Sequence, residues 1–263
     1  MLDGFELLAL LGLGLVSGVV GGMVGVGGSI VIIPVLTVVM RYDQHLSQAT
    51  AMIVNISVAA AALFRHHQAQ AVRWDVVLRM VPLGIVFILV GVEVSNLLEG
   101  EVLKRIYGAF LVYVIVFNTV KLFDDHRSSP DAPEPHVGWR RVGMVGGSMG
   151  FVAGLLGIGG GPVANPLLQG VCRLPLRQTI ATSSAVMCLT ALVGSAHKNL
   201  TLADLTPALS INESLLIAAC LAPTAAFGAF VGAGLTHALP VRWVRVAFIL
   251  LMVWASANML GVV

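Results

Sequence analysis

Residues 22–36 read GMVGVGGSIVIIPVL, and residues 154–168 read GLLGIGGGPVANPLL, the same pattern 132 positions further along the chain. The match extends outward on both sides of these stretches. The residues that coincide are Gly14, Gly18, Gly22, Gly25, Gly27, Gly28, Pro34, Ala49 and Thr50 in the first copy and Gly146, Gly150, Gly154, Gly157, Gly159, Gly160, Pro166, Ala181 and Thr182 in the second. The chain therefore contains an internal repeat with a glycine-rich interruption at the same place in each half.

Both copies lie in sequence that is apolar enough for a membrane. Hydrophobic residues make up 57% of the chain and charged residues 11%, against about 25% charged residues in a typical soluble domain. Several runs without Asp, Glu, Lys or Arg reach the roughly 20 residues that a helix needs to cross a bilayer. The composition therefore predicts an integral membrane protein with the lipid bilayer as a partner. The charges are confined to loops, so the net charge of +2 gives no argument for nucleic acid.

Reading the apolar runs as helices predicts an all-α polytopic membrane protein with about five helical elements in each half, some short or broken. The first repeat, residues 1–122, is expected to contain helices at 5–24, 28–40, 46–64, 76–96 and 102–122. The second, residues 140–263, is expected to contain helices at 140–157, 158–171, 177–196, 213–236 and 241–261. Past residue 200 the offset between the repeats grows from 132 to 141. Residues 123–139, rich in Pro and Asp, are predicted to form a solvated linker.

The orientation of the two repeats can be inferred from Lys and Arg, which are in excess in cytoplasmic loops. If each short segment returns to the side from which the preceding helix entered, the repeats are inverted, and one side collects eleven of the fifteen Lys and Arg residues. The other side then holds Arg41, Lys104, Arg105 and Lys198. If the glycines only kink one long crossing, the split is seven against eight. The bias favours inverted repeats, with both termini outside and the linker in the cytoplasm.

The glycines are expected to have two different roles, because each glycine in a helix interior costs about 1 kcal/mol relative to alanine. The upstream glycines recur every four residues, which is the small-residue ridge that lets two membrane helices approach closely. The downstream glycines are too dense for a continuous helix. We expect them to interrupt it and to be followed by a short helix that begins near Ser29 or Pro162, since proline is favoured in a first helical turn.

A helix that begins inside a membrane presents N–H groups without internal partners, and these attract anions. Glycine-interrupted hydrophobic segments in matching places of two halves are also the typical position of a transporter's substrate site. No Lys or Arg is predicted at mid-depth, so backbone amides and neutral side chains would hold a small anionic substrate. The predicted binding residues are Gly25, Gly27, Gly28, Ser29, Thr50 and Asn55 in the first half and Gly157, Gly159, Gly160, Gly161, Asn165, Thr182, Ser183 and Ser184 in the second.

Other interpretations of these residues remain open at this point. The glycines could serve helix packing alone, and Thr182, Ser183 and Ser184 could bond to their own helix. Glu93 near the end of its span is expected to be interfacial, with proton coupling as the alternative. Cys172, Cys188 and Cys220 show no metal-ligand spacing, and no nucleophile, acid–base pair or dinucleotide fold accompanies the glycines. We therefore expect no enzyme, no metal and no cofactor.

At these residues the chain resembles the sulfite exporter TauE/SafE family, also called the TSUP permeases, over essentially its whole length. The resemblance rests on the two glycine-rich blocks, each followed by a proline and then by an Ala-Thr pair. The second block, GIGGGPVANPLL, is the more typical of the family. The first block departs from it, because Ser29 replaces the third glycine and position 30 is Ile rather than Pro.

The resemblance implies transport of small sulfur-containing anions, such as sulfite, sulfoacetate or related sulfonates, across the bacterial inner membrane. It implies neither one substrate nor an oligomeric state. With a negative cell interior, outward movement of one negative charge gains about 2.3 kcal/mol per 100 mV, which favours export. We expect a secondary transporter or facilitator that works by alternating access between the repeats. The alternatives are an anion channel of the same architecture and a membrane assembly factor without transport.

Overall fold

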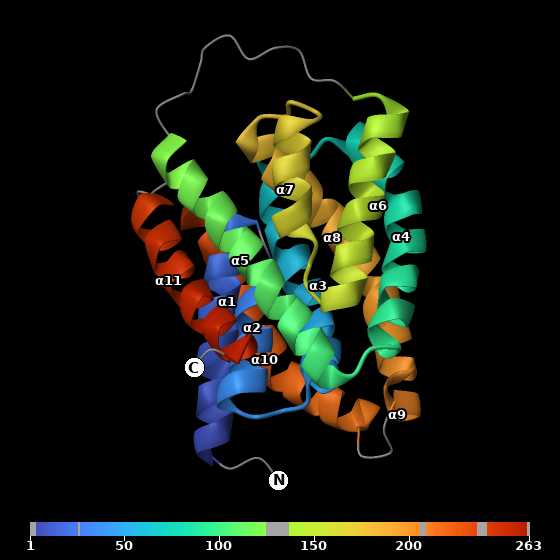
Figure 1. The fold of residues 1–263 in the computed structure, drawn as a ribbon. Coiled ribbons are helices and arrows are strands. Elements are labelled where there is room, and N and C mark those ends of the chain that lie inside the picture. The colour runs from blue at the N-terminus through green and yellow to red at the C-terminus, as the bar shows by residue number, and fades with distance from the viewer. Residues whose placement is uncertain (1–3, 26, 125–136, 206–208, 236–240, 262–263) are drawn as a thin grey trace.

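The computed structural model of the chain describes residues 4–25, 27–124, 137–205, 209–235 and 241–261. Its regular elements there are all helices (Figure 1). The first half contains α1 (Gly4–Val24), α2 (Ser29–Pro34), the π-helical segment η1 (Val35–Val39), α3 (Gln44–Gln68), α4 (Trp74–Asn96) and α5 (Gly100–Asp124). The second contains α6 (Trp139–Leu156), α7 (Gly161–Gly170), α8 (Leu176–Leu200), α9 (Leu202–Leu205), α10 (Ile211–Leu235) and α11 (Val241–Met259).

The bundle has two ends, which differ in the elements that begin and end there (Figure 1). At the lower end α1, α3 and α5 begin, and α4, α8 and α11 end. At the upper end α3 and α5 end, and α4, α6 and α8 begin. The first elements of the two halves, α1 and α6, therefore enter the bundle from opposite ends.

Each of these two helices stops inside the bundle at a glycine break and the chain turns back. We call Gly25–Gly28 the first break and Gly157–Gly160 the second break. Gly25 and Gly157 adopt φ values of +67° and +71°, a left-handed conformation that ends a helix and that only glycine adopts without cost. The short helices α2 and α7 then begin at Ser29 and Gly161, as the sequence predicted.

Two helices form the centre of the bundle and three surround them. Among the described residues, five helices are long and apolar enough to cross a membrane: α1, α3, α4, α8 and α10. In the most apolar stretch of α3 and of α8, 67% and 72% of the residues are buried, whereas the value is 33–39% for the other three. The exposed side chains of the outer helices include large apolar ones such as Phe227 and Leu78, which face lipid if the bundle is embedded. The protein is a multi-pass membrane protein.

The upstream glycines form the close helix contacts that the sequence predicted, and each contact joins the two halves. A Cβ atom at Gly18 or Gly22 of α1 would collide with the backbone of α10 at Ala225 or Ala229. The equivalent glycines of α6 behave alike: a Cβ atom at Gly150 would collide with the backbone of α4 at Gly84. Each half therefore buries its glycine ridge against a helix of the other half.

The predicted helix boundaries differ from the observed ones mainly where polar residues continue a helix. We expected helices to end at residues 64 and 196, but α3 runs to Gln68 and α8 to Leu200. The error arose because Arg65 and Lys198 were treated as loop residues, although both are helical. The short helix α9 was not predicted. Residues 125–136, most of the predicted linker, lie outside the described residues.

Candidate functional site

The two glycine breaks meet in the interior of the bundle. The backbone N–H of Gly159 donates a hydrogen bond of 3.2 Å to Ser29 Oγ, and Asn165 Nδ2 donates one of 3.0 Å to the backbone carbonyl of Gly25. A Cβ atom at Gly27 would lie 3.5 Å from the Cα atom of Gly159. The two breaks are thus in direct contact, and each contributes polar backbone groups to one small region.

The first polar pair at this region is Ser29 and Asn55, which lie at the start of α2 and in the middle of α3. Asn55 Oδ1 accepts a 3.2 Å hydrogen bond from the Ser29 N–H, and Asn55 Nδ2 donates one of 2.8 Å to Ser29 Oγ. The Tyr107 hydroxyl of α5 donates to the Ser29 carbonyl at 3.4 Å. All three side chains are fully buried or nearly so. Asn55 therefore caps α2, and Ser29 Oγ links that cap to the second break.

The second polar pair is Asn165 and Ser183, which belong to α7 and α8. Ser183 Oγ donates a 2.8 Å hydrogen bond to Asn165 Oδ1 and also lies 3.1 Å from the carbonyl of Ile180 in its own helix. Asn165 in turn holds the carbonyl of Gly25, as described above. Each half therefore supplies one buried polar pair, and each pair reaches across to the break of the other half.

The two pairs do not occupy equivalent positions of the repeat. With the 132-residue offset, the counterparts of Ser29 and Asn55 are Gly161 and Met187, and the counterparts of Asn165 and Ser183 are Ile33 and Ala51. Met187 lies against both breaks: its Sδ atom would be 3.3 Å from a Cβ atom at Gly27, and a Cβ atom at Gly159 would collide with it. The site is thus asymmetric, with polar and apolar positions exchanged between the halves.

A small cavity adjoins the breaks. Its volume is about 10 Å³, and it is lined by uncharged residues: Met52, Asn55, Ile88, Ala153, Ile158, Gly159, Met187, Thr190 and Ala191. A cavity of this size holds about one water molecule, so a sulfur oxyanion does not fit without movement of the surrounding helices. The region between the breaks therefore has no room for such an anion in this structure, and we call this arrangement its closed form.

Several predicted site residues lie apart from the meeting point of the breaks. Thr50 Oγ1 is hydrogen-bonded to Ser214 of α10 at 3.4 Å, and Thr182 Oγ1 accepts from the backbone N–H of Arg73 at 3.2 Å. Ser184 bonds to its own helix at the carbonyl of Ile180. Gly157 packs against Gln48, Gly160 packs against Met149, and Gly28 and Gly161 flank the starts of α2 and α7. The meeting point therefore involves Gly25, Gly27, Ser29, Asn55, Gly159, Asn165 and Ser183.

Sequence reasoning missed two kinds of residue near the site. Tyr107 was read as part of an apolar helix, and nothing in its spacing marks it. Lys198 was counted as a loop cation on the outer side, but it is a helical residue with 0% exposure. The sequence around Lys198 could have indicated this. Only His197 separates Lys198 from the uncharged run 178–196, and no turn residue stands between that run and Lys198.

Larger openings lie at the two ends of the bundle. At the lower end an opening of about 690 Å³ is lined by polar and charged residues that include Arg41, Asp43 and Lys104. Tyr42 also lines it, and burial together with the carboxylates of Glu6 and Glu213 raises the pKa of its phenol. At the upper end an opening of about 280 Å³ is lined by Arg65, His66, Gln68, Ala69, Arg177, Ala233 and Gly234.

Two helices that are interrupted and meet inside the bundle are an architecture typical of secondary transporters. The sulfite exporter TauE/SafE family model matches residues 10–259. The chain therefore belongs to the sulfite exporter TauE/SafE family, which confirms the resemblance found in the sequence.

Individual relatives are described as probable membrane transporter proteins. MamO of Paramagnetospirillum magneticum is 26% identical, with 97% of this chain and 44% of MamO covered. MJ0441 of Methanocaldococcus jannaschii is 28% identical over 72% of this chain and 73% of that protein. YunE of Bacillus subtilis is 24% identical over 88% of each. The chain thus spans less than half the length of MamO, and no solved structure matches it.

Proposed function

We propose that this protein is a secondary transporter or facilitator of small sulfur-containing anions, such as sulfite, sulfoacetate or related organosulfonates, across the bacterial inner membrane. The direction is export, and the mechanism is alternating access between two inverted repeats. The observation that carries the proposal is the contact between the two glycine breaks, where backbone groups and two buried polar pairs from different halves meet. A small cavity lined by uncharged residues, Asn55 and Gly159 among them, adjoins this contact.

The chemistry of this region suits a small oxyanion that must also be released. Asn55, Asn165, Ser29 and Ser183 can donate hydrogen bonds, and Gly159 contributes a backbone N–H. Hydrogen bonds to a charged group are worth about 1.5–3 kcal/mol each, so a few suffice for binding. Because the cavity lining contains no cation, the anion would not be trapped by a salt bridge.

Inverted repeats are supported by the directions and contacts of the helices. α1 and α6 enter from opposite ends of the bundle (Figure 1). The contacts of one half also recur in the other: α1 packs against α10 as α6 packs against α4, and α2 packs against α3 as α7 packs against α8. A twofold relation between the halves in the membrane plane accounts for both observations.

The distribution of cations supports a cytoplasmic upper end. Of the Lys and Arg side chains that the structure describes, seven belong to residues at the upper end: Arg65, Arg73, Arg79, Arg140, Arg141, Arg173 and Arg177. Four belong to the lower end: Arg41, Lys104, Arg105 and Lys198. The excess at the upper end follows the rule that cytoplasmic loops carry more Lys and Arg.

Alternating access is supported by the small size of the cavity beside the breaks compared with the openings at the two ends of the bundle. The opening at each end is far larger than this cavity. Movement of one hairpin, α1–α2 or α6–α7, would separate the breaks and enlarge the cavity toward one end. A channel of the same architecture is the alternative, and it would require both ends to open at once.

The deciding experiment measures binding and flux on the full chain. A thermal-shift and calorimetric screen should show stabilisation by sulfite, thiosulfate or sulfoacetate and little by zwitterionic taurine or small carboxylates. In proteoliposomes, flux of the best ligand should saturate and show counterflow. Linear flux without counterflow would indicate a channel, and no binding by any sulfur anion would contradict the proposed substrate class.

Orientation has a separate test. In a variant without native cysteines, Ala69→Cys at the upper end should react with an impermeant thiol reagent only from the cytoplasm, and Asp204→Cys in α9 only from outside. Both positions are exposed, so labelling needs no opening of the bundle. Reaction of both from one side would refute the inverted arrangement.

A further inference from the structure

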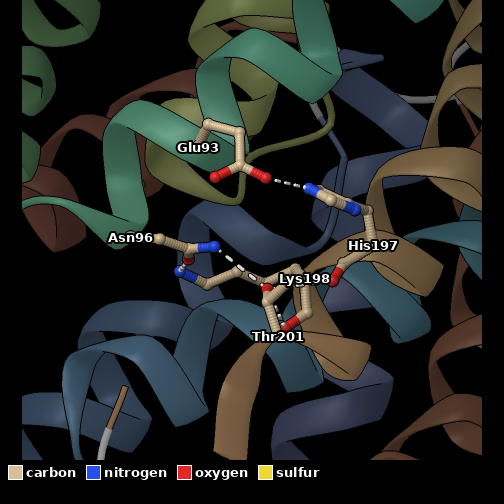
Figure 2. A network of polar contacts seen from close by, with 5 residues as sticks. All are labelled: Glu93, Asn96, His197, Lys198 and Thr201. Atoms are coloured by element: carbon tan, nitrogen blue, oxygen red, sulfur yellow. Dashed lines mark hydrogen bonds and ion pairs between the residues drawn. The ribbon is translucent and has the colours of Figure 1, made fainter. Parts of the chain in front are cut away.

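Lys198 is a buried cation outside the site described above. It lies near the end of α8 with no exposed surface. Its ammonium group points toward the first turn of α3 and the last turn of α4, at the lower end. Nζ lies 3.0 Å from His45 Nδ1, 3.0 Å from Ser95 Oγ and 2.7 Å from Asn96 Oδ1. We call these four residues the Lys198 cluster, and Figure 2 shows Lys198 and Asn96 beside the contact between Glu93 and His197.

The partners of Lys198 are all acceptors, because their own protons are already used. His45 Nε2 lies 3.1 Å from the carbonyl of Leu98, so Nε2 carries the proton and Nδ1 accepts. Ser95 Oγ donates to Gln48 at 3.1 Å. Asn96 Nδ2 donates to Thr201 Oγ1 at 3.0 Å (Figure 2), which turns Oδ1 toward Lys198. Three acceptors around one nitrogen require three N–H donors, and only the ammonium form of lysine has three.

The cluster joins the two halves of the chain. Lys198 belongs to the second half, whereas His45, Ser95 and Asn96 belong to the first. From Ser95 the hydrogen bonds continue through Gln48, whose Nε2 donates to the carbonyl of Leu155 at 3.4 Å. Leu155 is in the last turn of α6, and the Gln48 side chain also packs against Gly157. A continuous path of contacts thus connects Lys198 with the second break.

We propose that Lys198 is a proton-binding site that controls opening of the lower end. With the proton bound, the cluster fastens α8 to the start of α3 and the end of α4 and holds this corner of the lower end closed, beside the opening of about 690 Å³. When Nζ loses a proton it has two donors and a lone pair for three acceptors, so one contact must break and the lower end is released. In the transport cycle proposed above, the proton on Lys198 is the ligand whose binding is coupled to transport. Only this physiological role rests on the proposed function.

The equivalent positions at the upper end show what the same place in the fold looks like without the cluster. With the 132-residue offset, Lys198 corresponds to His66, His45 to Arg177 and His197 to Arg65. These counterparts line the opening of about 280 Å³ at the upper end. The Lys198 cluster fills the corresponding place at the lower end with hydrogen-bonded side chains. Closure at this corner of the fold is therefore a property of the lower end.

Other titratable groups lie on the elements packed against α8 near the lower end, and they bear on the charge of Lys198. His197 on α8 itself is paired with Glu93 of α4, and Asp43 caps α3 by accepting from His45 N–H at 2.7 Å. The full set on these elements is Asp43 and His45 at α3, Glu93 on α4, His197 on α8, Asp204 on α9 and Glu213 on α10.

The experiment measures the distance between α4 and α8 at the lower end as the pH changes. Spin labels are attached at Leu97→Cys and Leu200→Cys, because both positions are strongly exposed. Double electron–electron resonance then reports the distance between them in the full chain without native cysteines, in nanodiscs and with no anion present. We expect one short distance at pH 6 and a longer population that grows toward pH 9. A second pair, Trp74→Cys and Leu176→Cys, should show no such growth at the upper end.

Substitutions in the cluster separate proton binding from a merely structural role. Lys198→Met should populate the longer distance at every pH. Asn96→Asp places a carboxylate beside the ammonium, which favours the charged form, so the midpoint of the transition should rise by about 1–3 pH units. Lys104→Met, which removes a partly exposed lysine paired with Glu101 at the same end, should leave the midpoint unchanged.

Three results would overturn the proposal: a wild-type distance that is constant from pH 6 to pH 9, an unchanged midpoint in Asn96→Asp, or the wild-type pH response in Lys198→Met. If Lys198→Met does not fold, the Asn96→Asp midpoint decides alone. Because these distances are recorded without substrate, they stand or fall independently of the anion screen that tests the proposed function.

Discussion

The two glycine breaks have nearly the same sequence but different backbone conformations. In the first break Gly25 and Gly27 have positive φ values of +67° and +86°, whereas in the second break Gly157 and Gly160 do, at +71° and +74°. Gly28, the counterpart of Gly160, has φ of −71° as the residue before α2. A shared GxGG pattern therefore specifies an interruption of the helix, but the surroundings determine which glycine takes the left-handed conformation.

The surroundings differ because the polar residues are exchanged between the halves. Asn55 holds the Ser29 N–H at the first break, whereas the residue equivalent to Asn55 in the second half is Met187, which packs on Gly159. The second half compensates with Asn165, which reaches the first break at Gly25. Equivalent substitutions in the two halves should thus have unequal effects, and these inequalities can be measured.

The largest inequality is expected between Gly160→Ala and Gly28→Ala. A methyl group at Gly160 would be strained by about 1–2 kcal/mol in the left-handed region, and its Cβ would lie 2.5 Å from Met149 Cγ. At Gly28 the nearest atoms to a Cβ are 3.4 Å away, at Ser17 and Val58. Gly160→Ala should abolish transport and lower the melting temperature, whereas Gly28→Ala should keep both. Proteoliposome flux and thermal unfolding are the measurements.

A ridge glycine provides the control for that comparison. Gly18→Val should also destabilise the protein, because its side chain would collide with the backbone of α10. Less folded protein should be recovered at extraction. The molecules that do fold should keep the conformation of both breaks. Normal flux per folded Gly160→Ala molecule, or loss of flux in Gly28→Ala, would refute the conformational difference between the breaks.

The next effect concerns the polar pairs. Asn55→Ala and Asn165→Ala should each weaken substrate affinity by about 1–3 kcal/mol, the cost of leaving a charged partner short of one hydrogen bond. Calorimetric titration measures it. Ile33→Leu and Met187→Leu, at the equivalent positions of the other half, serve as matched controls. Both substitutions conserve side-chain volume, so we expect little change in affinity. Equal effects at equivalent positions would show that the site is symmetric.

A smaller effect is expected from Ser29→Gly, which gives the first break the glycine found at the equivalent position of the second. The substitution removes the hydroxyl that accepts from Gly159 and from Asn55, while Asn55 Oδ1 still accepts from the backbone N–H at position 29. We expect a loss of affinity of about 1 kcal/mol, the typical value of one hydrogen bond. An unchanged affinity would mean that Ser29 only joins the two breaks in the closed form.

The smallest effects should come from residues away from the breaks. Thr182→Val loses only the contact with the Arg73 N–H, and Arg173→Ala removes an exposed loop cation that is screened within about 8 Å at physiological salt. Neither residue contacts the breaks, so both substitutions should change affinity by less than about 0.5 kcal/mol, the usual range for changes away from a site. Thr182 is buried, so its substitution can also lower stability. If Arg173→Ala instead abolishes binding, the anion sits at the upper mouth and the breaks are scaffolding.

The order and approximate position of the helices could be predicted from the sequence. Membrane helices are specified by the length of each apolar run and by the glycines that interrupt it. The starts of α2 at Ser29 and α7 at Gly161 follow from glycine density and from Pro162, and the ridge contacts follow from four-residue spacing. These features depend on residues close together in the sequence, so they can be read from it.

The partners of the polar residues could not be read in the same way. Thr182 was expected at the breaks because it follows a repeated alanine, but it bonds to Arg73, which is 109 residues away. Tyr107 and Lys198 reach their partners across 78 and 153 residues. Such contacts depend on how helices from different halves are placed against one another, and no local pattern records that placement.

The exchange of glycine ridges between the halves has a consequence for biogenesis. α1 packs against α10, which begins 187 residues after α1 ends. At elongation rates of about 5–20 residues per second, α1 waits roughly 10–40 seconds in the bilayer before its partner is synthesised. During that interval its bare glycine ridge faces lipid or the insertion machinery. The protein can complete its tertiary structure only after α10 has been synthesised, so truncated chains that lack α10 should be targets for membrane proteases.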